Sequence, residues 1–61
     1  MAEGYICFKT SAGTYVSTKK YKSHADGAKW VSAELAARGL KASDIRGAVM
    51  WPVDKNGKST S

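Results

Sequence analysis

The chain has 61 residues, a formal net charge of +5 and an apolar share of 43%. This length excludes a separate catalytic domain, and this apolar share excludes a disordered tail. Cys7 is the single cysteine, which excludes an internal disulfide and fits a reducing cytoplasm. No apolar run reaches the roughly 18 residues that a membrane span requires, so we expect a cytoplasmic protein without membrane contact. We expect a single domain over residues 1–61, with residues 1–3 and 58–61 frayed.

Residues 5–10 and 14–18 are two short segments rich in aromatic and β-branched residues, separated by Ser-Ala-Gly. The glycine permits a tight reversal, so the pattern predicts a β-hairpin. Strand alternation places Ile6 and Phe8 on one face, toward the core. If the second strand is in phase, Val16 joins them.

A helix is predicted between a capping box at 23–26 and Gly39. Ser23 and Asp26 have the spacing at which a hydroxyl and a carboxylate cap each other's backbone amides. Gly39 offers the left-handed residue that ends a helix, with Leu40 folding back onto it. The expected apolar side consists of Ala28, Trp30, Val31, Leu35 and Ala37, and the expected solvent side consists of Lys29, Glu34 and Arg38.

After a linker at 41–44, residues 45–53 read as a third strand whose end is limited by Pro52. A crossover can place it beside the first strand. The sequence therefore predicts an α+β fold in β-β-α-β order, with one helix on one face of a three-stranded, mostly antiparallel sheet. Alternation sends Met50 and Trp51 to opposite faces, so one of the two should be accessible.

No acidic residue lies between residues 4 and 25, where four lysines alternate with aromatic residues. On the sheet face that one helix leaves uncovered, tyrosines ringed by lysines would stack on bases and neutralise phosphates. A second interpretation stays open, in which the tyrosines stabilise the sheet and the lysines keep its edges soluble. In a strict strand Lys20 and Lys22 point away from that face, so they could instead wrap an edge. The candidate binding residues are Lys9, Lys19, Lys20, Lys22, Tyr5, Tyr15 and Tyr21.

Catalytic and metal-binding patterns are not evident in the sequence. His24 is the single histidine and occupies the second position of the capping sequence, where an exposed cap residue is expected. One cysteine and one histidine fall short of the three or four ligands that a metal site needs. No nucleotide-binding glycine motif is present. We therefore expect a protein that is not an enzyme and that uses no cofactor.

The stretch 14–39, TYVSTKKYKSHADGAKWVSAELAARG, resembles the end of the arm-type DNA-binding domain of phage integrases. There, a basic strand leads through a capped turn into an alanine-rich helix with a tryptophan. The resemblance implies a sheet in a DNA groove, with Lys9, Lys19, Lys20 and Lys22 on phosphates. The strand expected at 45–53 departs from that family, whose sheet precedes its helix.

The β-β-α-β layout is also similar to that of the small inhibitors of host RNA polymerase made by short-tailed phages. This resemblance concerns architecture only, and it implies docking of a charged strand or sheet edge on a host protein. We thus expect a basic regulatory module of phage or mobile-element type that binds nucleic acid, DNA before RNA, through its uncovered sheet face. The alternative is an inhibitor or adaptor of an acidic host protein. Either a monomer or a strand-paired dimer is compatible with an exposed edge strand.

Overall fold

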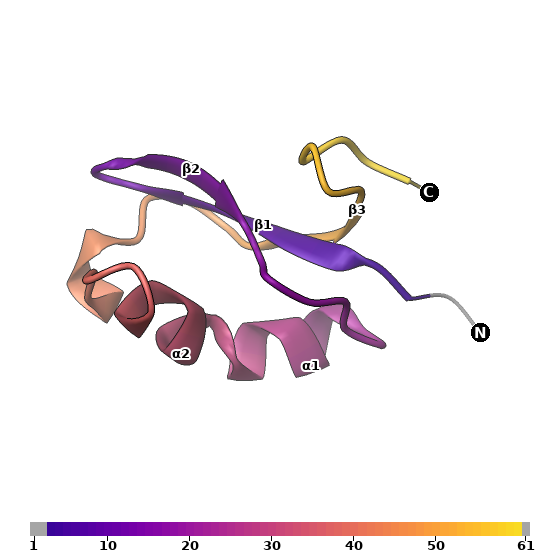
Figure 1. The fold of residues 1–61 in the computed structure, drawn as a ribbon, viewed down its shortest axis with the longest axis horizontal. Helices are drawn as coiled ribbons and strands as arrows, with labels where there is room; N and C mark the ends of the chain where they lie inside the picture. Colours follow the sequence, from indigo (N-terminus) through magenta and orange to yellow (C-terminus); the bar gives the residue numbers. More distant parts are fainter. Residues whose placement is uncertain (1–2, 61) are drawn as a thin grey trace.

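An antiparallel sheet of three strands forms the centre of the computed structural model, which describes residues 3–60 (Figure 1). The strands are β1 (Tyr5–Thr10), β2 (Gly13–Val16) and β3 (Met50–Val53), in the spatial order β2-β1-β3. The crossover therefore lays β3 beside β1, on the side away from β2. This arrangement confirms the predicted α+β class and the three-stranded antiparallel sheet.

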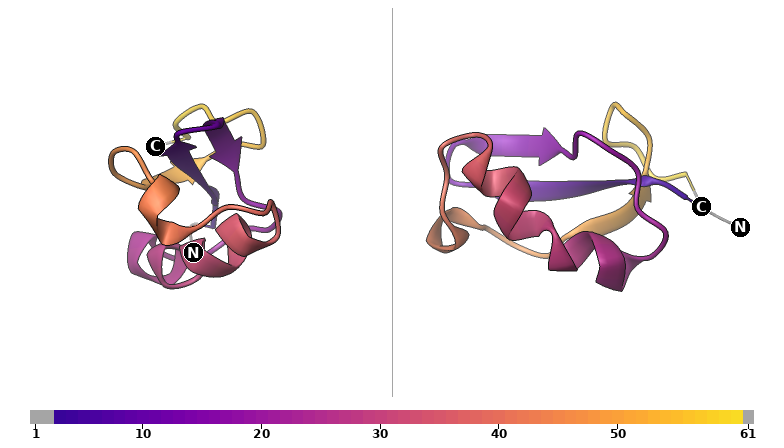
Figure 2. Two further views of the ribbon diagram at one scale, coloured as in Figure 1. Left: turned by 90° about the vertical axis from the view of Figure 1, so that its left-hand side faces the viewer. Right: turned by 60° about the horizontal axis from the view of Figure 1, so that its bottom comes forward.

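Two short helices, α1 (His24–Lys29) and α2 (Val31–Ala36), cover one face of the sheet, so the prediction of one continuous helix is wrong (Figure 2). The break lies at Trp30, whose φ and ψ are −101° and 2°. Its amide donates to the carbonyl oxygen of Gly27 at 3.0 Å, three residues back, so the last turn of α1 is tightened. A side chain at Gly27 would collide with Ile6, and this close approach lets α1 rest directly on β1.

The predicted helix signals are confirmed at Ser23 and Gly39, but the Asp26 carboxylate accepts from the amide of Lys22, at 3.4 Å, instead of that of Ser23. The Ser23 hydroxyl accepts from the amide of Asp26 at 3.1 Å and begins α1. Gly39 has a φ of 74°, and the amide of Leu40 donates to the carbonyl oxygen of Leu35 at 2.9 Å. This backward bond is typical of a glycine-terminated helix, and Leu40 packs against the core.

The register of the hairpin differs from the expected phase. Cys7 pairs with Val16 and Phe8 pairs with Tyr15. Tyr15 therefore lies beside Phe8 on the helix face, with 6.2 Å between the ring centroids, and Val16 shares the opposite face with Cys7. The prediction that Val16 faces the core and Tyr15 the open face is wrong, because a one-residue difference in register exchanges the two faces of a strand.

The main core lies between the sheet and the helices. Its fully buried members are Ile6, Phe8, Tyr21 and Leu35. Partly buried side chains pack around them, namely Tyr15, Val31, Leu40, Ile45, Val49 and Trp51. The helix face of this small domain thus absorbs two of its three tyrosines.

The opposite face of the sheet is partly covered by the C-terminal segment, residues 54–60, which runs above the sheet in Figure 1. A Cβ atom at Gly57 would lie 3.3 Å from Val16 and 3.8 Å from the Cys7 sulfur. Ser59 bridges to Val53, and Cys7 is only 6% exposed. The expected uncovered face is therefore wrong where the segment lies. Part of the tail expected to fray, residues 58–60, runs beside β3, whereas residues 1–2 and 61 lie outside the described part of the chain.

The stretch between α2 and β3 is more irregular than predicted. The expected linker contains a single turn of 3-10 helix, η1 (Ala42–Asp44). Ile45 then forms an isolated bridge with Thr10, and regular pairing begins only at Met50. None of the helices within residues 3–60 has the length and apolar character that crossing a bilayer demands.

Candidate nucleic-acid interface

Three of the four candidate lysines lie on the connection between β2 and α1, which we call the lysine loop (residues 17–22). The loop begins at Ser17, a buried residue whose amide donates to the carbonyl oxygen of Ile6 at 2.9 Å. The Ser17 hydroxyl accepts from the amide of Ile6 at 3.1 Å and donates to the carbonyl oxygen of Lys19 at 2.6 Å. One serine thus joins the first residues of the loop to the centre of β1.

Glu34, on α2, provides the second anchor, and its expected place on the solvent side is wrong because it is only 5% exposed. Its carboxylate accepts from the amide of Thr18 at 3.1 Å, the hydroxyl of Tyr21 at 2.8 Å and the guanidinium of Arg38 at 3.0 Å. Arg38 also donates to the carbonyl oxygen of Val16 at 2.9 Å. This buried charge therefore ties α2 to both ends of the loop.

The same contacts shift two pKa values. Burial raises the pKa of the Tyr21 hydroxyl to about 12, aided by its hydrogen bond to the Glu34 carboxylate and by that negative charge. Burial alone would raise the pKa of Glu34, but the hydrogen bonds from Tyr21, Arg38 and Thr18 together outweigh it and hold that pKa below its usual value. Glu34 is therefore ionised at neutral pH, and Tyr21 is not.

The third anchor closes the loop at Tyr21. Gly4 and Tyr21 exchange two backbone hydrogen bonds, of 3.0 and 2.7 Å. The indole N–H of Trp51 donates to both carbonyl oxygens, at 3.0 Å from that of Tyr21 and 3.2 Å from that of Gly4. The start of the chain, the lysine loop and β3 are consequently held together at one point.

The lysine side chains leave this fixed backbone in different directions. The Lys19 ammonium lies 5.0 Å from the ring centroid of Trp30 and 5.5 Å from that of Tyr21, on the helix side. The Lys20 ammonium lies 5.9 Å from the ring of Tyr5, toward the C-terminal segment. Lys22 is exposed at the entrance to α1. These distances are within the range of cation–π attraction.

Two hollows flank the loop. The first, of about 280 Å³, lies between the loop and α2, and we call it the Trp30 groove. The second, of about 300 Å³, lies between the loop and the C-terminal segment, and we call it the Lys20 hollow. The Trp30 groove is lined by Thr18, Lys19, Tyr21, Trp30, Ala33, Glu34 and Ala37, and the Lys20 hollow by Glu3, Gly4, Tyr5, Lys20, Val53, Asp54, Lys55 and Thr60.

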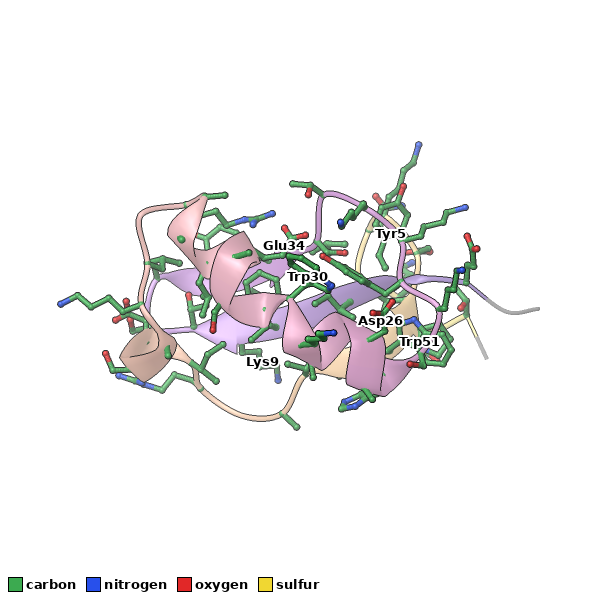
Figure 3. All side chains as sticks on the ribbon, turned by 90° about the horizontal axis from the view of Figure 1, so that it is seen from below. Tyr5, Lys9, Asp26, Trp30, Glu34 and Trp51 are labelled. Atoms are coloured by element: carbon green, nitrogen blue, oxygen red, sulfur yellow. The ribbon has the colours of Figure 1, made fainter. Side chains whose placement is uncertain are left out.

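The predicted tyrosine platform does not form. Tyr21 is 3% exposed and Tyr15 is half-buried against Phe8, so their expected position on an open sheet face is wrong. Tyr5 is half-buried under Lys20 on the opposite side of the sheet. Lys9 is exposed on β1 but lies four residues along the strand from Tyr5, about 13 Å, and Figure 3 shows the two well separated. The structure thus places Lys19, Lys20 and Lys22 on one loop but directs the side chains of Lys19 and Lys20 to different sides of it, and Lys9 lies apart on β1.

Most acidic side chains accept hydrogen bonds from the backbone, and among the described residues none forms an ion pair with a lysine of the loop. Four of the five carboxylates, those of Asp26, Glu34, Asp44 and Asp54, accept hydrogen bonds from backbone amides. The ten Lys and Arg residues include Arg38 and Arg46, so eight are lysines. Within residues 3–60 the one ion pair joins Arg38 and Glu34, and no lysine has a carboxylate partner. The positive charge of the surface is therefore free to act on a ligand.

Sequence reasoning missed one functional candidate, Trp30, which it assigned to the core. This side chain is 44% exposed, whereas Trp51 packs against the core. The alternation argument for β3 is confirmed, since Met50 is 47% exposed and Trp51 is half-buried. The helical period placed Trp30 beside Val31 on the apolar side, but Trp30 lies at the break between α1 and α2 and its side chain is exposed. Comparison of the chain with protein-family models, curated proteins and solved structures finds no match, so the functional argument depends on the lysine loop and the two hollows beside it.

Proposed function

We propose that this protein is a small non-enzymatic regulatory module that binds nucleic acid through the lysine loop. The observation that carries the proposal is the contrast between the backbone and the side chains of that loop. Its backbone is fixed to β1, α2 and β3, while Lys19, Lys20 and Lys22 have no carboxylate partner among the described residues.

A fixed loop loses little conformational entropy on binding, so the attraction of its ammonium groups for phosphate is not spent on ordering the backbone. A nucleic-acid strand carries repeated negative charges along its sugar-phosphate backbone. Each lysine that reaches a phosphate releases a condensed counterion. A formal net charge of +5 on 61 residues also speeds the encounter with such a ligand.

The test compares two double variants that remove the same charge. Lys20→Gln with Lys22→Gln removes loop lysines, and Lys9→Gln with Lys41→Gln removes exposed lysines from elsewhere. Binding to duplex DNA, single-stranded DNA and RNA is measured by fluorescence anisotropy at about 50 mM and about 200 mM salt. The loop variant should flatten the plot of log affinity against log salt by about 1.8 for duplex DNA, while the control changes it by less than half as much. Equal flattening by both variants would contradict a role of the loop.

An acidic protein partner is the second candidate, and the observation that favours it is the exposure of Met50. Methionine is enriched at the centres of protein interfaces, and Met50 is 47% exposed at the start of an outer strand. Failure of all three nucleic acids to bind at micromolar concentration and low salt would favour this candidate. A partner retained from nuclease-treated lysate by the native chain, and lost on Met50→Thr, would then identify the interface.

A further inference from the structure

Trp30 is the one large aromatic side chain that the described fold leaves exposed. Its backbone is fixed by the bond from its amide to Gly27 and by the bond from Glu34 to its carbonyl oxygen at 3.1 Å. A tryptophan ring that remains 44% exposed does not gain the full free energy of burial that the core side chains gain. Tryptophan is enriched among the residues that dominate binding interfaces, so an exposed tryptophan on a fixed backbone is a candidate ligand contact.

The Trp30 groove provides open space beside this ring. Ala33 and Ala37 follow Trp30 by three and seven residues, so they lie on the same side of the helical layer, and their small side chains leave room beside the ring. Figure 3 shows Trp30 and Glu34 close together beside α2. The groove, of about 280 Å³, is thus a shallow space with an aromatic ring on one side.

The charged groups of the groove act differently on the phosphate and on the nucleobase of a nucleotide. The Lys19 ammonium lies over the Trp30 ring, 5.0 Å from its centroid, and 5.5 Å from that of Tyr21, whereas the ionised Glu34 carboxylate is only 5% exposed. A phosphate is attracted to the Lys19 ammonium, whereas the Glu34 carboxylate is already paired with Arg38 and is only an acceptor. A flat, uncharged nucleobase needs no charged partner and can stack on the indole.

We propose that the Trp30 groove receives an unpaired nucleobase, so that the ligand of this protein is single-stranded nucleic acid, with the adjoining phosphate on Lys19. This inference rests on the proposed function, because it requires that the lysine loop binds phosphates. A base inside a duplex is stacked on both sides and cannot enter the groove, whereas a base in a single strand is free to do so.

The test uses an oligodeoxythymidine of about 12 nucleotides, an abasic oligomer of equal length and a blunt hairpin duplex. Trp30→Ala should weaken binding of the oligodeoxythymidine roughly 5- to 150-fold, the factor expected for the loss of one stacked base. Binding of the abasic oligomer and of the duplex should change less than about twofold, because neither offers a base to the ring. Trp30→Phe keeps a ring and should retain most of the affinity. Met50→Ala removes an exposed apolar side chain elsewhere and is the matched control for Trp30→Ala.

Fluorescence provides a second readout that does not depend on a destabilising substitution. The native chain contains two tryptophans, and Trp51 is held against the core. Oligodeoxythymidine should quench the emission of the native chain, and this quenching should be absent from Trp30→Phe, which emits from Trp51 alone. Quenching that persists in Trp30→Phe, or equal weakening of all three ligands by Trp30→Ala, would overturn the groove as a base site. If the duplex binds and the oligodeoxythymidine binds no better than the abasic oligomer, the groove is not a base site, but the proposed function is retained. If no nucleic acid binds, both proposals are overturned.

Discussion

The face of the sheet that carries Ile6 and Phe8 packs against two helices, whereas the face that carries Cys7 packs against the C-terminal segment. The helical layer is fastened by a buried carboxylate, Glu34, which accepts from the loop and from its own helix. The C-terminal segment is held by close contact at Gly57 and by backbone bonds to β3. The helical layer thus adds a buried ion pair to its apolar packing, whereas the C-terminal segment is held by close packing and backbone bonds.

The difference explains where a ligand can bind. Because both covers occupy sheet surface, little of either sheet face stays open, and three exposed lysines lie at the edge between the covers, on the lysine loop. The helix-side cover keeps Trp30 exposed beside Lys19, and the other cover leaves Tyr5 half-buried under Lys20. Six substitutions test how far the two covers differ, in order of decreasing effect.

Glu34→Ala should have the largest effect, lowering the free energy of unfolding by about 3 kcal/mol, because it leaves Arg38, Tyr21 and the amide of Thr18 without their shared acceptor. Urea denaturation measures the loss. Ser32→Ala, at an exposed position of the same helix, is the control and should change stability by less than about 0.5 kcal/mol. A loss for Glu34→Ala no larger than that of the control would show that the helical layer is not fastened by this charge.

Gly57→Ala should loosen the other cover by about 1–2 kcal/mol, because φ is 84° there and the new Cβ would lie 3.3 Å from Val16. The rate at which a thiol reagent labels Cys7 should then rise about 5- to 30-fold under native conditions. Gly47→Ala is the matched control, since φ is 91° and nothing lies within 4 Å of the new Cβ. Equal acceleration by both variants would mean that Cys7 is exposed by global unfolding and not by movement of the C-terminal segment.

Tyr21→Phe should lower the free energy of unfolding by about 1 kcal/mol at neutral pH, through loss of the hydrogen bond to Glu34. Because the pKa of Tyr21 is raised from 10.0 to about 12, its contribution is fully present below pH 10 and is lost as the pH rises through 12. The native chain should therefore lose stability in this alkaline range, and Tyr21→Phe should lose less. If both chains lose the same stability as the pH rises, another group causes the loss.

The pKa of Glu34 is lowered, so its contribution to stability depends on pH in the opposite sense and decreases as the pH falls. Its contribution is present above its unfolded value of 4.5 and is lost as the pH falls through the lower folded value. Glu34→Gln should flatten this part of the stability profile, measured by urea denaturation at a series of pH values below 5. A profile that keeps its full acid slope in Glu34→Gln would exclude Glu34 as the cause.

Lys19→Gln and Lys20→Gln should have the smallest effects on stability, about 0.5–1 kcal/mol or less for each. Lys19 approaches two rings and Lys20 approaches one, so the loss should be larger for Lys19. Thermal unfolding at low salt measures the difference, with Lys9→Gln as the control. The reverse order would mean that the Lys20 hollow is the more strongly coupled side of the loop.

Local chemistry was sufficient to predict the elements of this fold whose signals lie within a few residues. Ser23 and Gly39 bound the helical region as expected, because a capping hydroxyl and a left-handed glycine act on their immediate neighbours. The hairpin also formed where aromatic and β-branched residues flank a glycine turn. Its register was missed, because β2 begins at Gly13 instead of residue 14 and a single residue decides which side chains face the helices.

The candidate site was only partly predictable, since it depends on contacts between distant parts of the chain. The three lysines of the loop were identified from charge alone. The burial of Glu34 depends on Thr18 and Tyr21, more than ten residues away, and no local pattern signals it. The exposure of Trp30 depends on a helix break that lacks proline, and the cover over Cys7 depends on a turn near the end of the chain.

The bridge of Gly4 to Tyr21 and that of Val53 to Ser59 bring both described ends of the chain to the Lys20 hollow, which Glu3 and Thr60 help to line. Glu3 and Thr60, the first and last described residues, therefore both lie beside this hollow. An acidic fusion partner or affinity tag placed there would compete with a ligand for Lys20 and Lys55, whereas the Trp30 groove opens on the helix side. The position of a tag is thus itself a variable in measuring what this protein binds.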